Sequence, residues 1–324
     1  LKNTTVRSTP ISRWRGSVFG GSTNKPQSVI MTRSGTESNT TSSIPTRDDD
    51  AIELRIVASQ QNAIRHLVSL SDLIAFTVGG VFRIFSGSEE PLTPNNVRPK
   101  AQAASGAANV TPALTDGSIL YVQAQGARIR ELSYSWEQNR FASADVSLMA
   151  PHLFDGYTVV DMAFALSPVP TLWTVRSDGV LLGMTYVPEH QVYAWHQHDT
   201  DGLFESVAVV AEDNESVLYA VVKRTINGRT IRIIERMASR FFEEKADAFI
   251  VDCGLTYSGS AATVITNLHH LEGETVSILA DGAVKPPQQV TNGRITLDTA
   301  AAKVHVGLPI AASLRTLPLA AQNM

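Results

Sequence analysis

Cysteine is almost absent from this chain, and it is one of several absences that narrow the possible functions. Cys253 is the single cysteine among 324 residues, which excludes an internal disulfide framework and a cysteine-based metal site. Within its apolar run, Cys253 is expected to be a small buried hydrophobic residue. No apolar run approaches the roughly 18 residues of a membrane-spanning helix, so no membrane span is predicted. Residues 1–5 lack the charged-then-apolar pattern of a secretion signal, and because the first residue is not Met we expect a longer parent protein.

Strong positive charge is missing as well. The formal net charge is −4 at pH 7 and the pI is near 6.1, which gives no support to tight nucleic-acid binding, because that needs a clustered basic surface. No Gly-x-Ser-x-Gly, P-loop or useful Gly-x-Gly-x-x-Gly motif is present. The 43% hydrophobic content is that of a globular protein with a substantial core, and the length allows two domains.

Tight-turn dipeptides are what the chain has in abundance. Asn and Gly, or Asp and Gly, tolerate the positive φ angles of a two-residue hairpin, so these pairs are the strongest local mark of antiparallel β structure. Most of them stand between short apolar runs that alternate with polar residues. The five Asp-Gly and two Asn-Gly pairs occupy positions 116–117, 155–156, 178–179, 201–202, 281–282, 227–228 and 292–293.

A repeated unit follows from these turns: an apolar strand, a turn with glycine, and a second alternating strand. The turn glycines at 79, 126, 179 and 228 are separated by 47, 53 and 49 positions. A period of about 40–50 residues with weaker flanking strands, here 192–196 and 205–210, is typical of β-propeller blades. A solenoid or a β-sandwich is the alternative. The strand pairs are 73–78 with 81–85, 119–123 with 127–134, 171–175 with 180–186, and 217–222 with 230–235.

The predicted fold is all-β, with propeller-like antiparallel blades followed by a smaller β domain. Residues 1–50 form a loop-rich start with one hairpin at 16–31, and the Ser- and Thr-rich segment 34–43 is expected to be a long exposed loop. Residues 51–248 form the blades, and 235–248 is the one stretch expected to hold a helical turn or two. Residues 249–324 form a small β-sandwich or barrel, with strands at 276–280, 295–297 and 304–308.

Two clusters of potential metal ligands are present, but the spacing of their residues is only weak evidence for a metal site. Consecutive carboxylates such as Asp48, Asp49 and Asp50 seldom point at one cation, so a solvated acidic turn, or the start of a helix or strand, is the favoured interpretation over a divalent-cation site. His196 and His198, followed by Asp199, alternate onto one face of a strand and could supply two metal ligands, but no third is predictable. An exposed strand end or a subunit contact is favoured for them.

The other reactive side chains do not form a recognisable catalytic or binding pattern in the sequence. His269 and His270 are expected on opposite faces of a strand, which argues against joint ligation. Asp and Glu fall mainly in turns and at charge-balanced edges, so no carboxylate pair for glycoside hydrolysis stands out. Four aromatic residues fit core or blade packing better than a sugar platform: Trp173, Trp195, Tyr186 and Tyr193. We predict no catalytic, cofactor or metal residue, and no enzyme.

Seven strings, taken in order, resemble the tail nozzle (tail tubular or stabilisation) proteins of short-tailed bacteriophages. Each string is weak alone, but their order and spacing make the resemblance fairly specific, and it extends from about residue 14 to 317. Members of that family are typically longer, with an N-terminal portion that this chain does not match. The strings are residues 48–54, 62–67, 72–77, 173–179, 192–196, 222–228 and 271–276.

The resemblance implies a structural protein of the virion tail, assembled in the host cytoplasm. Its expected partners are five further copies of itself in a homohexameric ring, the adaptor or portal-proximal tail proteins, and fibres or the host surface. Genomic DNA would pass through the ring without tight binding, which a mildly acidic chain without a basic stripe suits. The alternative is a propeller-type glycosidase or depolymerase, or a carbohydrate-binding module, acting on host surface glycans.

Overall fold

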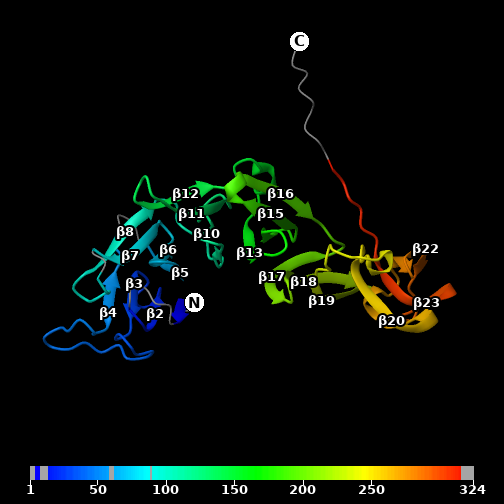
Figure 1. The fold of residues 1–324 in the computed structure, drawn as a ribbon, viewed down its shortest axis with the longest axis horizontal. Helices are drawn as coiled ribbons and strands as arrows, with labels where there is room; N and C mark the ends of the chain where they lie inside the picture. Colours follow the sequence, from blue (N-terminus) through cyan, green and yellow to red (C-terminus); the bar gives the residue numbers. More distant parts are fainter. Residues whose placement is uncertain (1–3, 8–13, 58–61, 88–89, 315–324) are drawn as a thin grey trace, which may run out of the picture. The chain divides into compact units, whose positions relative to one another are not determined.

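Short strands joined by tight turns make up the regular structure (Figure 1). The computed structural model describes residues 4–7, 14–57, 62–87 and 90–314. Within these ranges the helical elements are single turns of 3-10 helix: η1 (Pro151–Leu153), η2 (Pro188–His190), η3 (Lys245–Asp247) and η4 (His269–Leu271). The chain is therefore all-β, as the turn pairs predict.

The first half of the chain forms three antiparallel sheets of four strands. The first sheet contains β1 (Thr4–Arg7), β2 (Ser17–Gly20), β3 (Ser28–Met31) and β4 (Ile52–Arg55). The second contains β5 (Ile64–Ser69), β6 (Leu73–Thr77), β7 (Val81–Ser86) and β8 (Val97–Ala103). The third contains β9 (Ala113–Leu114), β10 (Ser118–Val122), β11 (Ile129–Ser135) and β12 (Arg140–Asp145).

Three more sheets follow in the second half. The fourth sheet contains β13 (Val159–Ala165), β14 (Thr171–Arg176), β15 (Leu181–Val187) and β16 (Val192–His198). The fifth contains β17 (Leu203–Glu212), β18 (Glu215–Ile226) and β19 (Arg229–Arg236). The sixth contains β20 (Asp252–Ile265), β21 (Thr275–Ala280), β22 (Ala283–Gln289) and β23 (Ile295–Leu308).

The first five sheets share one connectivity, in which each strand pairs with its neighbours in sequence. All four strand pairs predicted around glycines 79, 126, 179 and 228 are present, as β6–β7, β10–β11, β14–β15 and β18–β19. An up-and-down sheet that recurs about every 50 residues is the unit of a β-propeller blade. The sequence prediction of propeller-like repeated antiparallel blades is confirmed.

Burial of the second strand in the second to fourth sheets shows how the sheets pack. Every residue of β6 and β14 is buried, so both faces of these strands are covered. One apolar cluster joins the first and second sheets, another joins the second and third, and a third joins the third and fourth. Because each inner sheet packs on two neighbouring sheets, the sequence of its second strand is largely apolar and does not alternate between apolar and polar residues.

Positive φ angles appear at the predicted turns. Asn227 and Gly228 have φ of 47° and 72°, and Asp281 and Gly282 have 47° and 77°, so both residues of each pair take the left-handed conformation of a type I′ hairpin. The pairs at 116–117 and 178–179 also join paired strands. The pair at 155–156 instead follows η1, and the pair at 201–202 lies between β16 and β17, so these two turn the chain without making a hairpin.

The chain divides into two compact units. One comprises Leu1–Asp199 and Phe204–Leu218, and the other comprises Thr200–Leu203 and Tyr219–Met324. The predicted domain boundary near residue 249 lies inside the second unit, just before β20 begins. The segment 235–248, expected to hold a helical turn or two, contains the single turn η3 after β19 ends.

The sixth sheet differs from the others in order, which is β20-β23-β21-β22. Strands β20 and β23 are 14 residues long and pair with register shifts, which bend strands. The sheet encloses its own apolar cluster and is not a closed barrel. Residues 295–297 and 304–308, expected as two strands, are parts of the one strand β23, because no turn residues separate them.

Candidate functional site

The acidic run at 48–50 organises the loop between β3 and β4. Asp50 is buried, and its carboxylate accepts hydrogen bonds from the backbone N of Ser43 and of Arg47, each at 2.8 Å, and from the Ser43 hydroxyl at 2.9 Å. These bonds lower the pKa of Asp50, with the bond from Arg47 the largest cause. Asp49 is exposed and pairs with Arg33 at 2.7 Å. The run therefore forms a turn just before β4, as predicted, but Asp50 is buried in it and is not solvated, because the loop's own donors bind its carboxylate.

The histidines at 196 and 198 lie on one face of β16, as predicted. Nδ1 of His196 is 2.8 Å from Nε2 of His198, and their ring centroids lie 5.8 and 5.3 Å from that of Trp173. Gly183 on the neighbouring strand has no side chain, which leaves room for the His196 ring. Asp199 is exposed beyond the end of β16. Within the described ranges, no group of three or more His, Cys, Asp and Glu residues could hold a metal ion.

The prediction for His269 and His270 is wrong. They lie in the 3-10 turn η4 and not in a strand. The ring of His269 lies over Gly293, and Nε2 of His270 is 3.1 Å from the carbonyl oxygen of Cys253. A single 3-10 turn precedes β21 here, and Leu268 and Leu271 beside the two histidines are buried. Cys253 itself is buried, as predicted, and burial raises the pKa of its thiol to about 12.

The aromatic residues pack between strands and sheets, as predicted. Trp173 and Tyr186 are buried in the fourth sheet. Trp195 stacks edge-on against Phe154, and its Nε1 donates to the carbonyl oxygen of Val146 at 2.9 Å. None of these rings serves as an open platform, because each is held by core contacts or by a hydrogen bond.

Sequence reasoning missed a buried carboxylate at the junction of the third and fourth sheets. Glu131 on β11 is 7% exposed and accepts hydrogen bonds from the hydroxyls of Tyr186 at 2.8 Å and Tyr193 at 3.2 Å. Ser118 lies 2.6 Å from the Tyr186 hydroxyl and donates to it, since that hydroxyl donates to Glu131. Burial, with the neighbouring carboxylate, raises the pKa of Tyr186 to about 12. Glu131 and Tyr186 are 55 positions apart in the sequence, so no local sequence pattern predicts their hydrogen bond.

A second buried charge lies in the second unit. The Arg224 side chain is fully buried and binds Glu235 through two hydrogen bonds of 2.6 and 2.9 Å. It also donates to Asp252 at 3.1 Å and to the carbonyl oxygen of Asp201 at 2.8 Å. These partners lie on β19, at the start of β20 and in the segment before β17. One guanidinium therefore ties three parts of the unit together.

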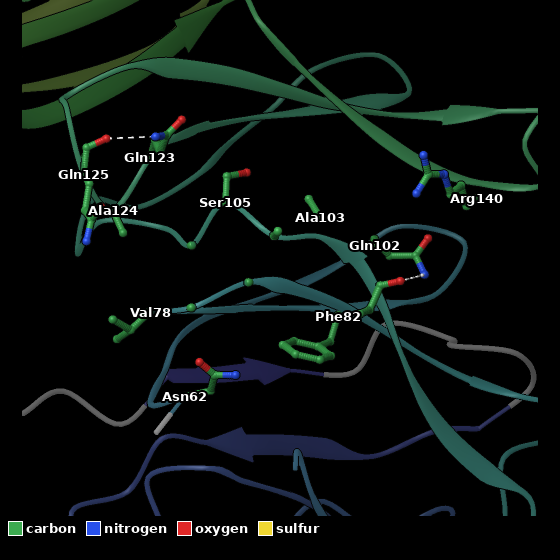
Figure 2. Close-up of a pocket in the computed structure, with 15 residues that line it drawn as sticks. Asn62, Val78, Phe82, Gln102, Ala103, Ser105, Gln123, Ala124, Gln125 and Arg140 are labelled. Atoms are coloured by element: carbon green, nitrogen blue, oxygen red, sulfur yellow. Dashed lines mark hydrogen bonds between the residues drawn. The ribbon is translucent and has the colours of Figure 1, made fainter. Parts of the chain in front are cut away.

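The described part of the chain contains a cleft at the turns of the second and third sheets (Figure 2). Its volume is about 690 Å³, within the usual range for small-molecule sites. Figure 2 shows Asn62 and Phe82 on one side of it and Ser105 and Gln123 on the other. A smaller neighbouring cleft of about 390 Å³ shares the segment 102–105 and also contacts Arg130 and Ser143.

Backbone contacts build the wall of this cleft. The amide N of Ala107 donates to Thr77 at 2.8 Å, and the amide N of Ala124 donates to Gly106 at 2.8 Å. The segment after β8 thus bridges the end of β6 and the end of β10. A Cβ atom at Gly106 would overlap the carbonyl group of Val78, so this approach requires glycine.

The polar groups of the cleft are mostly amides and hydroxyls. Gln102 is buried, with its Oε1 accepting from the backbone N of Phe141 at 2.8 Å. The Ser105 hydroxyl lies 2.8 Å from that of Tyr121. Gln123 accepts from Arg130 at 3.2 Å and donates to the carbonyl oxygen of Gln125 at 3.0 Å. These groups are therefore already oriented by the protein. Sequence reasoning passed over the cleft, although the glycines at 79 and 126 mark the two turns that form it.

Comparisons with known proteins leave the family open. No family model matches the chain, and no curated protein matches it. Solved structures give low similarity. A luciferin-regenerating enzyme has 8% identity and a TM-score of 0.29 over 68% of this chain and 88% of that one. Raptor from Chaetomium thermophilum has 9% identity and a TM-score of 0.33, over 97% of this chain and 29% of that one. The PQQ-bound aldose sugar dehydrogenase from Streptomyces coelicolor has 10% identity and a TM-score of 0.21, over 72% of this chain and 98% of that one. At these scores the similarities say nothing about function.

Proposed function

We propose that this protein is a structural subunit of a bacteriophage tail nozzle, built into a homohexameric ring through which the genome leaves the virion. Two features support this role. Seven strings between residues 48 and 276 follow the order and spacing of that family, within a resemblance that extends from about residue 14 to 317, and the chain folds as repeated antiparallel sheets. Its partners would be copies of itself, an adaptor above and fibres or the host surface below.

The observation that carries the proposal is the use of buried charge as internal cross-links. Glu131 is held by two tyrosines, Arg224 by Glu235 and Asp252, and Asp50 by its own loop. Each of these three side chains has its hydrogen bonds satisfied by other groups of the protein. This arrangement suits a rigid scaffold better than a catalytic centre, where a titrating group must face the substrate. Rigidity is what a conduit under internal pressure requires.

The charge of the whole chain fits a passage for DNA. With a net charge of −4, the protein lacks the basic excess that would hold phosphates and slow transit. The described residues include no helix with the length and apolar character to cross a membrane. We place the protein in the virion tail after assembly in the host cytoplasm.

Hydrolysis of host glycans is the competing function, and the two clefts do not favour it. A glycosidase needs a pair of carboxyl groups beside the scissile bond. The described residues that line the clefts include no Asp or Glu. The amide and hydroxyl groups that line the two clefts suit the binding of a ligand better than the cleavage of a bond.

Negative-stain electron microscopy of the purified full chain, alone and with its adaptor, tests the proposal. The expected image is an annulus with sixfold symmetry that docks on the adaptor ring. Release of reducing ends from host capsule or lipopolysaccharide, with no annulus in any preparation, would contradict it and favour the enzyme.

A further inference from the structure

The larger cleft has one polar side chain that the protein leaves unsatisfied. Asn62, just before β5, is 3% exposed, and its Oδ1 has no hydrogen-bond partner among the described residues. An unpaired buried amide oxygen is destabilising, so such groups are rare and call for an explanation. Figure 2 shows the Asn62 side chain directed toward the cleft.

Glycine makes room for this side chain. A Cβ atom at Gly79 would overlap Oδ1 of Asn62, and the adjacent Gly80 approaches the carbonyl oxygen of Ala103 closely. The Asn62 carboxamide therefore sits in a niche that exists only because residue 79 has no side chain. Rotation of the carboxamide by half a turn about its last bond would exchange its oxygen and nitrogen, so either a donor or an acceptor can face the cleft.

The charge of the lining restricts the class of ligand. Among the described residues that line the larger cleft, Arg140 carries the only charge, and its Nε donates to Gln138 at 2.8 Å. The remaining polar contributions are neutral and come from Asn62, Gln102, Ser105 and the glutamines of the β10–β11 turn. The lining also has an apolar part, from Val78 and the Phe82 ring.

Hydroxyl groups match this lining best. A sugar hydroxyl both donates and accepts, as does a carboxamide, so the two pair in either orientation of Asn62. A phosphate or nucleotide is usually held by several cations, whereas Arg140 is the one charged side chain among the described residues of the lining. A volume of about 690 Å³ accommodates one or two sugar rings.

We propose that this cleft is a binding site for a neutral glycan unit, in which a ligand hydroxyl satisfies the Asn62 carboxamide. The proposed activity is binding without cleavage, since the described residues of the lining include no carboxylate. This inference is independent of ring assembly, because every lining residue belongs to one compact unit of a single chain.

Saturation-transfer NMR with the full chain tests the site. The probes are glucose, galactose, rhamnose, N-acetylglucosamine and glucuronic acid, each at millimolar concentration. At least one neutral sugar is expected to receive saturation. Asn62→Leu should abolish the transfer and Gly79→Ala should reduce it several-fold, because the new Cβ displaces the carboxamide. Asn24→Ala is the matched control, since Asn24 is an exposed amide that is not among the residues lining the cleft, and it should change nothing.

A second measurement uses the wild-type protein, so that its result does not depend on whether a variant folds. Titration of the sugar that binds should shift the backbone amide resonances of Gly79 and Gly106 and leave those of Gly228 and Gly282 in place. The proposal is overturned if no neutral sugar receives saturation, if the signal persists in folded Asn62→Leu, or if the shifts map elsewhere. It is also overturned if glucuronic acid alone binds and Arg140→Gln abolishes that binding.

Discussion

At the scale of single residues, the chain places several polar and ionisable groups inside the β core and gives most of them specific partners. The buried Glu131 carboxyl group accepts hydrogen bonds from the hydroxyls of Tyr186 and Tyr193. Removal of a donor from a buried hydrogen bond leaves its acceptor unsatisfied, which costs more than the loss of a hydrogen bond at the surface. The loss of one such donor should therefore be felt more than the loss of a surface hydrogen bond.

Tyr186→Phe tests this point. The substitution keeps the ring and removes the donor to Glu131, so we expect the free energy of unfolding to fall by about 1–3 kcal/mol in urea denaturation. Tyr134→Phe is the matched control, because that hydroxyl donates to Asn139 in an exposed hydrogen bond. A loss in Tyr186→Phe no larger than in the control would show that Glu131 does not depend on the tyrosine.

His66 makes stability depend on pH. Burial lowers its pKa to about 4, with Arg65 adding to the effect, and its Nε2 has no hydrogen-bond partner in the described structure. Because the unfolded chain binds a proton near pH 6.5 and the folded chain does not, stability falls as pH drops from about 6.5 to 4. We expect His66 to account for about 2 kcal/mol of that fall after its partial exposure is allowed for.

The measurement is urea denaturation of the wild type and of His66→Asn at pH 7 and pH 4.5. The variant should lose less stability between the two pH values than the wild type does. Equal losses in both proteins would mean that other groups cause the pH dependence.

At the scale of elements, a single buried group joins several consecutive strands of the second unit. Arg224 on β18 binds Glu235 on β19 and Asp252 on β20, and it also reaches the backbone of Asp201. The Arg224 side chain is fully buried, whereas Glu235 and Asp252 are 19% and 25% exposed. Breaking such a cluster leaves carboxylates without their cation in a poorly solvated position.

Arg224→Met should destabilise the second unit by about 3 kcal/mol, at the lower end of the range for buried pairs because the carboxylates retain some solvent. The control is Lys303→Met, which removes a half-exposed ion pair with Asp247 in the same unit and should cost at most about 1 kcal/mol. Chemical denaturation followed by fluorescence and circular dichroism gives both values. Similar losses in the two variants would contradict a special role for Arg224.

The hairpins were predictable from sequence because their signals are local. The Asn227–Gly228 turn and the alternating strands beside it lie within one stretch of chain, and positive φ is a property of those two residues alone. The bond between Glu131 and Tyr186 joins separate sheets, so neither side chain reveals it. The cleft likewise needs Asn62 and Ser105, beside strands of the second sheet, to meet Gln123, beside β10 of the third sheet, which only the packing of the two sheets achieves. His269 and His270 were misplaced because an apolar neighbourhood does not distinguish a short turn from a strand.

At the scale of the whole molecule, the account rests on assembly. Five of the six described sheets share one connectivity, and buried polar groups form hydrogen bonds within each compact unit. The proposed nozzle role adds to this fold the association of six copies, and the net charge of −4 is compatible with the proposed passage of DNA. If the ring forms, the glycan site proposed at the cleft would give it a contact with a host surface.

The most direct test of assembly is the mass of the purified full-length protein in solution, measured by light scattering or mass photometry across a range of concentrations. A closed ring predicts a discrete species at six times the 35.0 kDa of the chain, stable on dilution. A protein that stays at the mass of one chain at every concentration, with and without its adaptor, would contradict the account.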